Sequence, residues 1–259
     1  MVETLSIHHF TTAADMYSRA KLPYFAGPLY AVIGKKQEAA REANSLISLK
    51  EHAAAATIKA LAGDKLGAFE AARKIGAPKS RLATLAIVAT LCDDKPNAAK
   101  FAVQLEKRHG LIVDAGIVHA VIGDVPSALR NAVQLEKQGK LVDAGLVYAF
   151  AGHKRKALQI SLELAKHGDS LAGAARIRII AGYPAEALAI VNHISKAGAH
   201  HTAGLLFARA HDTRGVQHSM NKLIAAGMLD EANQIGTYEL LRDLVYLGKL
   251  NEKKFHLLG

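Results

Sequence analysis

The chain has 259 residues, half of them apolar, and a formal net charge of +10 at neutral pH. This length and composition suffice for one large or two ordinary domains with a substantial core, and they exclude a disordered chain. Alanine and leucine dominate, tryptophan is absent and there are only six prolines. These proportions favour helices joined by short connections.

The sequence shows no signal for secretion or for membrane insertion. The N-terminal stretch has neither a basic start nor an unbroken apolar run, as a secretion signal would require. Every apolar stretch is interrupted by His, Arg, Asp or Gly before it reaches the ~18 to 20 residues needed to cross a bilayer. The single cysteine, Cys92, cannot form an internal disulfide. We therefore expect a cytoplasmic protein without a membrane span.

Residues 1–20, around the segment TTAADMYSRA, are predicted to form one helix. The terminal units of a helical stack must cover a core that would otherwise be exposed. Because a repeating pattern begins at about residue 21, we expect this first helix to be the N-terminal cap.

A step of the form A-x-x-G, or a close variant, recurs along the next two hundred residues. It ends at Gly34, Gly63, Gly123, Gly152 and Gly182, with weaker equivalents at Cys92 and His211. Successive ends are 29, 29, 31, 29, 30 and 29 residues apart. The segment AVQLEK also appears twice, at 102–107 and 132–137. Such regular spacing indicates a structural repeat of about thirty residues.

Each repeat is predicted to contain two short helices, a first (inner) helix that ends near the glycine and a second (outer) helix. Small residues flank the step, which suits close helix packing. Five residues after it stand Ala39, Ala68, Ala128, Ala157, Ala187 and Val216, with Ala98 displaced by one. Seven residues before it stand Gly27, Ala56, Gly116, Gly145, Ala175 and Gly204, with Leu85 as the exception.

This pattern resembles the tetratricopeptide repeat. The resemblance lies in the small residue of the inner helix, an aromatic three residues later at Tyr30, Tyr148 and Phe207, the helix-ending glycine and the alanine five residues on. The unit is shorter than the ~34 residues of that family and lacks its tryptophan, so we describe the repeats as degenerate. The resemblance implies a right-handed superhelix that serves as a docking surface for other proteins.

The period becomes irregular after His211, and residues 226–259 are predicted to form the C-terminal capping helices. We therefore expect an all-α solenoid, an α-α superhelix of about seven helix-turn-helix repeats over 21–225. The whole chain, 1–259, would form a single domain with a cap at each end.

The inner helices are apolar almost all round, unlike the amphipathic outer helices. One face carries an aliphatic column, and the opposite face carries mostly alanine flanked by Val113, Ile117, Val142 and Leu146. A helix that is apolar on two faces is normally buried on both. This apolar face can be buried in three ways: the inner helices pack against each other, a second copy of the chain pairs with the first, or an apolar segment of a partner lies along them.

Polar residues on the inner helices are few and therefore informative. Asp114 and Asp143 recur at one repeat position near a helix start, where the helix dipole favours a carboxylate. Arg176 and Arg178 are two residues apart and must point to different faces, so we expect at least one to reach a groove, a carboxylate of a partner or a phosphate. The candidate partner-binding residues are Lys59, Arg176, Arg178, His201 and Arg209.

Catalytic and metal-binding patterns are not found. The sequence has no glycine-rich phosphate loop and no CxxC, HExxH or GxSxG motif. Its thirteen histidines include no i, i+4 pair that would suggest a zinc site. A DNA glycosylase on a helical-repeat fold would need a catalytic carboxylate and groove-lining aromatics, and the chain supplies little of either. We expect a protein without catalytic residues, metal or cofactor.

Two functions from different classes remain. The first is a non-enzymatic scaffold that binds a protein or peptide segment through the inner face, with a second copy of the chain as another partner. The alternative is an RNA- or DNA-binding solenoid whose phosphate contacts come from His153–Lys156, Arg73–Arg81 and Arg176–Arg178. The basic excess is spread thinly along the chain, which is typical of solvated helix ends.

Overall fold

The computed structural model describes residues 2–167 and 170–258, and these residues form 17 α-helices. The predicted all-α solenoid architecture is therefore confirmed for the described part of the chain. The chain divides into two compact units, which we treat separately: unit 1 is Met1–Gly110 with Leu244–Gly259, and unit 2 is Leu111–Asp243. None of the described helices combines the length and the apolar character needed to span a bilayer.

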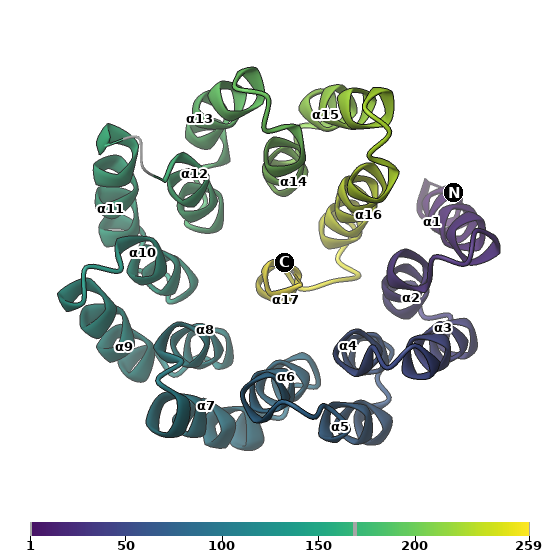
Figure 1. Cartoon of the computed structure of the whole chain (residues 1–259), viewed down its shortest axis with the longest axis horizontal. Coiled ribbons are helices and arrows are strands. Elements are labelled where there is room, and N and C mark those ends of the chain that lie inside the picture. Colours follow the sequence, from purple (N-terminus) through teal and green to yellow (C-terminus); the bar gives the residue numbers. More distant parts are fainter. Residues whose placement is uncertain (1, 168–169, 259) are drawn as a thin grey trace. The chain divides into compact units, whose positions relative to one another are not determined.

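Unit 1 consists of alternating inner and outer helices after the first helix. Its inner helices α2, α4 and α6 form one row, each packed against the next, and the outer helices α3, α5 and α7 form the other (Figure 1). The bounds are α1 (Val2–Arg19), α2 (Pro23–Val32), α3 (Lys36–Ser48), α4 (His52–Leu61), α5 (Lys65–Arg73), α6 (Pro78–Leu91), α7 (Lys95–His109) and α17 (Glu252–Leu257).

Unit 2 repeats the same arrangement. The inner helices α8, α10, α12 and α14 pack in sequence, and each contacts the outer helix that follows it (Figure 1). The bounds are α8 (Ile112–Ile122), α9 (Val125–Lys137), α10 (Leu141–Phe150), α11 (Lys154–His167), α12 (Leu171–Ile180), α13 (Pro184–Lys196), α14 (His200–Ala210), α15 (Thr213–Ala225) and α16 (Leu229–Tyr246), whose end from Leu244 belongs to unit 1.

A residue with positive φ ends the turn after each inner helix, and it fixes the true register of the repeat. These residues are Gly34, Gly63, Asp93, Gly123, Gly152, Gly182 and His211. The prediction had placed the third at Cys92, but Asp93 is the residue in the left-handed region, with φ 55°. With that correction Ala98 is five residues after the turn and Ala86 is seven before it. The third repeat is therefore regular, and the exception at Leu85 disappears.

Aspartates directly after several of these turns start the outer helices. The carboxylates of Asp64, Asp94, Asp124 and Asp212 each accept a hydrogen bond from a backbone N–H in the first turn of α5, α7, α9 and α15. Such an N-cap satisfies a donor that the helix itself cannot, and is worth about 1 kcal/mol. The turn and the cap together place each outer helix at the same point of the repeat.

The small residues of the inner helices accommodate β-branched side chains from the next inner helix. A Cβ added at Gly145 of α10 would lie 2.5 Å from Cδ1 of Ile177 on α12. Gly116 faces Val147 in the same way, and Gly27 faces Ile58. The aliphatic column is consequently at most 3 % exposed at Leu29, Ile58, Val88, Val118, Val147, Ile177 and Leu206. In the third repeat the register set by Asp93 places Val88 in this column.

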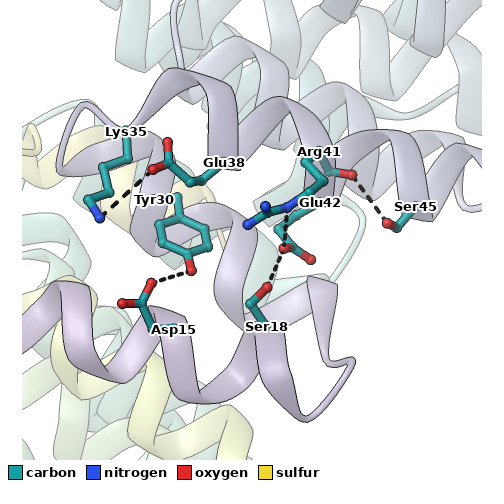
Figure 2. Close-up of polar contacts among 8 residues, drawn as sticks. All are labelled: Asp15, Ser18, Tyr30, Lys35, Glu38, Arg41, Glu42 and Ser45. Atoms are coloured by element: carbon teal, nitrogen blue, oxygen red, sulfur yellow. Dashed lines mark hydrogen bonds and ion pairs between the residues drawn. The ribbon is translucent and has the colours of Figure 1, made fainter.

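Helix α1 is attached to α2 and α3 by partly buried hydrogen bonds (Figure 2), and it also packs against α2. The hydroxyl of Tyr30 donates to Asp15 Oδ1 at 2.6 Å, and the hydroxyl of Ser18 donates to Glu42 Oε1 at 2.6 Å. Burial and the Asp15 carboxylate raise the pKa of Tyr30 to about 12. The aromatic position of the repeat thus fixes α1 over the first inner helix.

Helix α17 packs on the C-terminal end of α6 within unit 1. The Lys254 ammonium group donates to the Leu91 carbonyl at 2.9 Å and pairs with Asp93 at 2.8 Å. A cation at a helix C-terminus is favoured by the helix dipole. Leu257 and Leu258 pack against the core formed by α4, α5 and α6, and Phe255 has no exposed surface. The chain's own C-terminal helix therefore covers part of the apolar surface of α6.

We expect Phe255→Ala to destabilise the docking of α17, because truncating a fully buried phenylalanine costs about 3 kcal/mol or more. Hydrogen exchange in 252–257, followed by mass spectrometry, should become faster in this variant. Lys253→Ala, on the exposed side of the same helix, serves as the control. Equal exchange rates in the Phe255→Ala variant and the wild type would contradict the packing described here.

Candidate functional site

The inner face of unit 2 is formed by paired positions four residues apart on successive inner helices. Residues at this spacing lie on one side of a helix. The two positions are six and two residues before the turn that ends each inner helix. From α8 to α14 they are occupied by Ile117 and Val121, Leu146 and Phe150, Arg176 and Ile180, and Leu205 and Arg209, and the same period gives Gln234 and Tyr238 on α16. The face is apolar over α8 and α10 and becomes polar over α12, α14 and α16.

Arg209 is buried on this face. Its side chain stands where the preceding repeats have valine, leucine, phenylalanine or isoleucine, and the residue is only 5 % exposed. The guanidinium carbon lies 5.1 Å from the ring centroid of Tyr238 on α16, a favourable cation–π distance. Its Nε has no exposed surface and no hydrogen-bond partner.

Arg176, on α12, is the second arginine of the inner face, and with Arg209 and Tyr238 it forms a cluster. The residue is half-buried, and its Nε also has neither exposed surface nor a hydrogen-bond partner. Burial lowers the pKa of the Arg176 guanidinium. Burial likewise lowers the pKa of Arg209, and the charge of Arg176 lowers it further. Because α12 packs against α14 and the two residues lie on the same face of these helices, the two positive charges repel each other.

Neither guanidinium has a carboxylate partner among residues 2–167 and 170–258. Buried charges in proteins are normally paired, because removing an ion from water is expensive. The Tyr238 ring offsets part of this penalty for Arg209. An anion bound between the two arginines would remove both the repulsion and the unsatisfied donors.

Arg178 points away from this cluster, as the two-residue spacing from Arg176 predicts. Its Nε donates to the Ser161 hydroxyl at 2.9 Å, and one Nη donates to the Glu186 carbonyl at 3.1 Å. Arg178 stands at the repeat position of Tyr148 and Phe207. Its donors connect α12 to the outer helices α11 and α13. Arg178 therefore has a structural role and is not part of the candidate binding site.

The other two candidates have partners inside the chain. His201, on α14, shares a hydrogen bond of 2.9 Å with the side-chain amide oxygen of Gln234 on α16. Lys59 lies in unit 1, at the end of α4, and its ammonium group is 3.4 Å from Asp64. The structure therefore brings together two of the five predicted residues, Arg176 and Arg209, and His201 contacts the neighbouring helix on the same face.

Tyr238 was not predicted as a site residue, because it lies in the segment 226–259 that the irregular period assigns to the C-terminal cap. The repeat in fact extends into α16, since Ile235 fits against Gly204 as Ile177 fits against Gly145. Tyr238 follows Arg209 by 29 residues, the spacing of the repeat. Extending the period past His211 would have placed it on the inner face.

Asp114 and Asp143 form an acidic patch on the neighbouring helices α8 and α10. Asp114 is open to solvent, yet the protein surroundings of the inner face raise the pKa of its carboxyl, and the Asp143 charge raises it further. Asp114 is three residues before Ile117, on the same side of the helix. The inner face of unit 2 thus carries acidic groups over α8 and α10, apolar side chains between, and basic groups over α12 and α14.

We expect Asp143→Asn to lower the pKa of Asp114, because it removes a neighbouring negative charge. A raised folded-state pKa means that the unfolded chain ionises first, so this carboxyl makes wild-type stability fall as pH rises above about 4. The variant should weaken that dependence. Carboxyl ¹³C NMR titration of Asp114 checks the shift, and an identical titration in both proteins would rule out the contact.

The apolar inner surface is covered largely by the inner helices themselves. The residues three positions before each turn, Ala31, Ala60, Thr90, Ala120, Ala149, Ile179 and Ala208, are at most 5 % exposed. Adjacent inner helices pack against each other within each unit, as the first of the three predicted coverings requires, and α17 adds in unit 1 a covering that was not predicted. Val113, Ile117, Val121 and Val142 remain half-buried in unit 2.

Within the described ranges no group of three or more His, Cys, Asp or Glu side chains could hold a metal ion. No protein-family model and no curated protein sequence matches this chain. The helical-repeat assignment consequently rests on the period in the sequence and on the packing of the 17 helices, with their regular turns and glycine contacts.

Proposed function

We propose that this protein is a non-enzymatic helical-repeat scaffold, and that the inner face of unit 2 binds a segment of another protein. The observation that carries the proposal is the charge distribution on that face, with carboxylates over α8 and α10, half-buried aliphatic side chains, and two guanidinium groups that have no carboxylate partner among the described residues. An apolar strip with opposite charges at its ends matches a peptide segment that carries complementary charges.

The likeness of the repeats to tetratricopeptide units supports the same proposal, because that family usually binds other proteins. The polar groups also argue for a peptide over a nucleic acid. Asp114 and Asp143 on the inner face would repel a phosphate backbone. Two of the three basic segments named for nucleic-acid binding are not on this face: Arg73, Lys74 and Lys79 are exposed around the end of α5, and Lys156, on the outer helix α11, is paired with Glu136 at 2.6 Å.

Selection from a displayed library of random twelve-residue peptides on the full-length protein tests the proposal. We expect enriched peptides whose binding is lost with Ile117→Glu, because a charge would interrupt the apolar strip. Val133→Glu is the matched control, since Val133 is 42 % exposed on the outer helix of the same repeat. Thermal unfolding of each variant shows whether the fold is retained.

Binding of fluorescently labelled single-stranded RNA and duplex DNA tests the alternative function, a nucleic-acid-binding solenoid. The proposal expects no binding at about 50 mM salt. Phosphate contacts from several Lys and Arg would instead give binding that weakens steeply between about 50 and 200 mM salt. That result, or a library selection that enriches no peptide, would overturn the proposed function.

A further inference from the structure

We propose that Arg176 and Arg209 form a carboxylate-binding subsite on the inner face of unit 2, and that it holds an acidic group of the bound peptide. This inference rests on the proposed function and names the chemistry of one contact within it. It begins from the position of the two residues. Arg176 is equivalent to Ile117 and Leu146, and Arg209 is equivalent to Val121 and Phe150. Both cations thus replace apolar side chains of the repeat.

The donor geometry favours a carboxylate. Arginine binds carboxylates through two parallel N–H donors of its planar fork, and Nε is one of the donors that such a pair can use. In both residues Nε is buried and lacks a partner. Arg178, two residues from Arg176, shows the contrast, because its Nε and one Nη are already bonded to neutral oxygens. The buried Nε donors without a hydrogen-bond partner thus distinguish Arg176 and Arg209 from Arg178.

Tyr238 closes one side of the subsite. Its ring lies 5.1 Å from the Arg209 guanidinium carbon and is itself only 7 % exposed. The ring stabilises the cation and holds its plane without supplying a negative charge. Arg176 is only half-buried, whereas Arg209 is 5 % exposed. A bound carboxylate would therefore approach from the Arg176 side.

The surroundings select a peptide carboxylate over a phosphate chain. Ile180 and Leu205 flank the two arginines on the same face, so a ligand must be apolar on either side of its charge. The acidic patch of Asp114 and Asp143 belongs to the same inner face and disfavours further negative charges along the ligand. A segment with one Asp, Glu or C-terminal carboxylate between apolar residues satisfies both conditions.

The test uses the peptides enriched by library selection on the full-length protein. We expect them to share one carboxylate, and conversion of that group to its amide to weaken binding at least thirtyfold in a fluorescence polarisation assay, since a charge-assisted pair is among the strongest hydrogen bonds. The double variant Arg176→Gln/Arg209→Met should bind the acid and the amide equally. Arg214→Gln, an exposed cation on α15, is the matched control and should leave the preference unchanged.

A second readout comes from the arginine side chains. The Nε–H NMR signals of Arg176 and Arg209, assigned by the single variants, should shift when the acidic peptide binds and stay unchanged with its amide. Inorganic phosphate at 10 mM is the competitor and should leave the peptide bound.

Three outcomes separate the inference from the proposed function. Enriched peptides that bind without any carboxylate, or equally well to the double variant, would overturn the subsite and leave the scaffold function in place. Displacement of the peptide by phosphate at 10 mM or less would overturn the choice of a carboxylate. A selection that enriches nothing would overturn the proposed function together with the subsite.

Discussion

Replacing Arg209 by methionine is expected to raise the free energy of unfolding by about 1 to 2 kcal/mol in the absence of a partner. Methionine fills a similar volume, and exchanging a buried ion for a well-packed apolar side chain is often neutral or stabilising. Here the gain should be clear, because Arg209 is 5 % exposed and has no carboxylate partner in the described chain. The loss of the contact with Tyr238 subtracts from that gain. Urea unfolding monitored by circular dichroism measures the difference.

Arg178→Met is the matched control for this prediction. Arg178 is a half-buried arginine on an inner helix, but its donors bond Ser161 and the Glu186 carbonyl. Removing it should therefore lower the free energy of unfolding by about 1 kcal/mol or more. If Arg209→Met destabilised the protein as Arg178→Met does, then the fold would already satisfy Arg209. If Arg209 lowers the stability of the partner-free protein, as we expect, then its contribution is to binding a ligand.

The second prediction concerns the contact between adjacent inner helices. Gly145→Val should lower the free energy of unfolding by about 3 kcal/mol, because the added side chain would occupy the space filled by Ile177 and Ile160. The isoleucines belong to the next inner helix and to the adjacent outer helix, so the whole repeat would have to move. Thermal and urea unfolding of the variant provide the measurement.

A double-mutant cycle shows whether this effect comes from the named contact. In the background of Ile177→Ala, which empties the space beside Gly145, the Gly145→Val substitution should cost far less, with a coupling of about 1 to 3 kcal/mol. Gly76→Ala is the neutral control, since a Cβ there meets nothing within 4 Å. Additive effects would mean that the two residues do not form the contact described.

Most of the repeat pattern was predictable from residue types and spacing. The period identified the inner and outer helices, the aliphatic column and the small residues opposite it. The prediction was wrong by one residue in the third repeat, because a cysteine followed by an aspartate gave no glycine to mark the turn. Asp93 adopts the left-handed conformation there, which aspartate tolerates better than most residues. A rule based on glycine alone could not detect it.

The site was only partly predictable. An arginine on an apolar helix was recognisable as unusual, and the two-residue spacing correctly separated Arg176 from Arg178. What the sequence could not show was which polar residues are satisfied within the chain. His201 and Arg178 were as unusual in the sequence as Arg209, but they bond Gln234, Ser161 and a backbone carbonyl. These partners lie 17 to 33 residues away or on another helix, where no local pattern relates them.

The sequence by itself determined the all-α class, the length of the repeat and the side of each helix that is buried, because these follow from periodicity and from residues with special backbone or packing requirements. The tertiary structure decided what covers the inner helices, how far the repeat extends and which charges remain without partners. Those properties depend on the distance between side chains from different helices. Only the packing of Gly145 on Ile177, and of Arg209 beside Tyr238, could establish them.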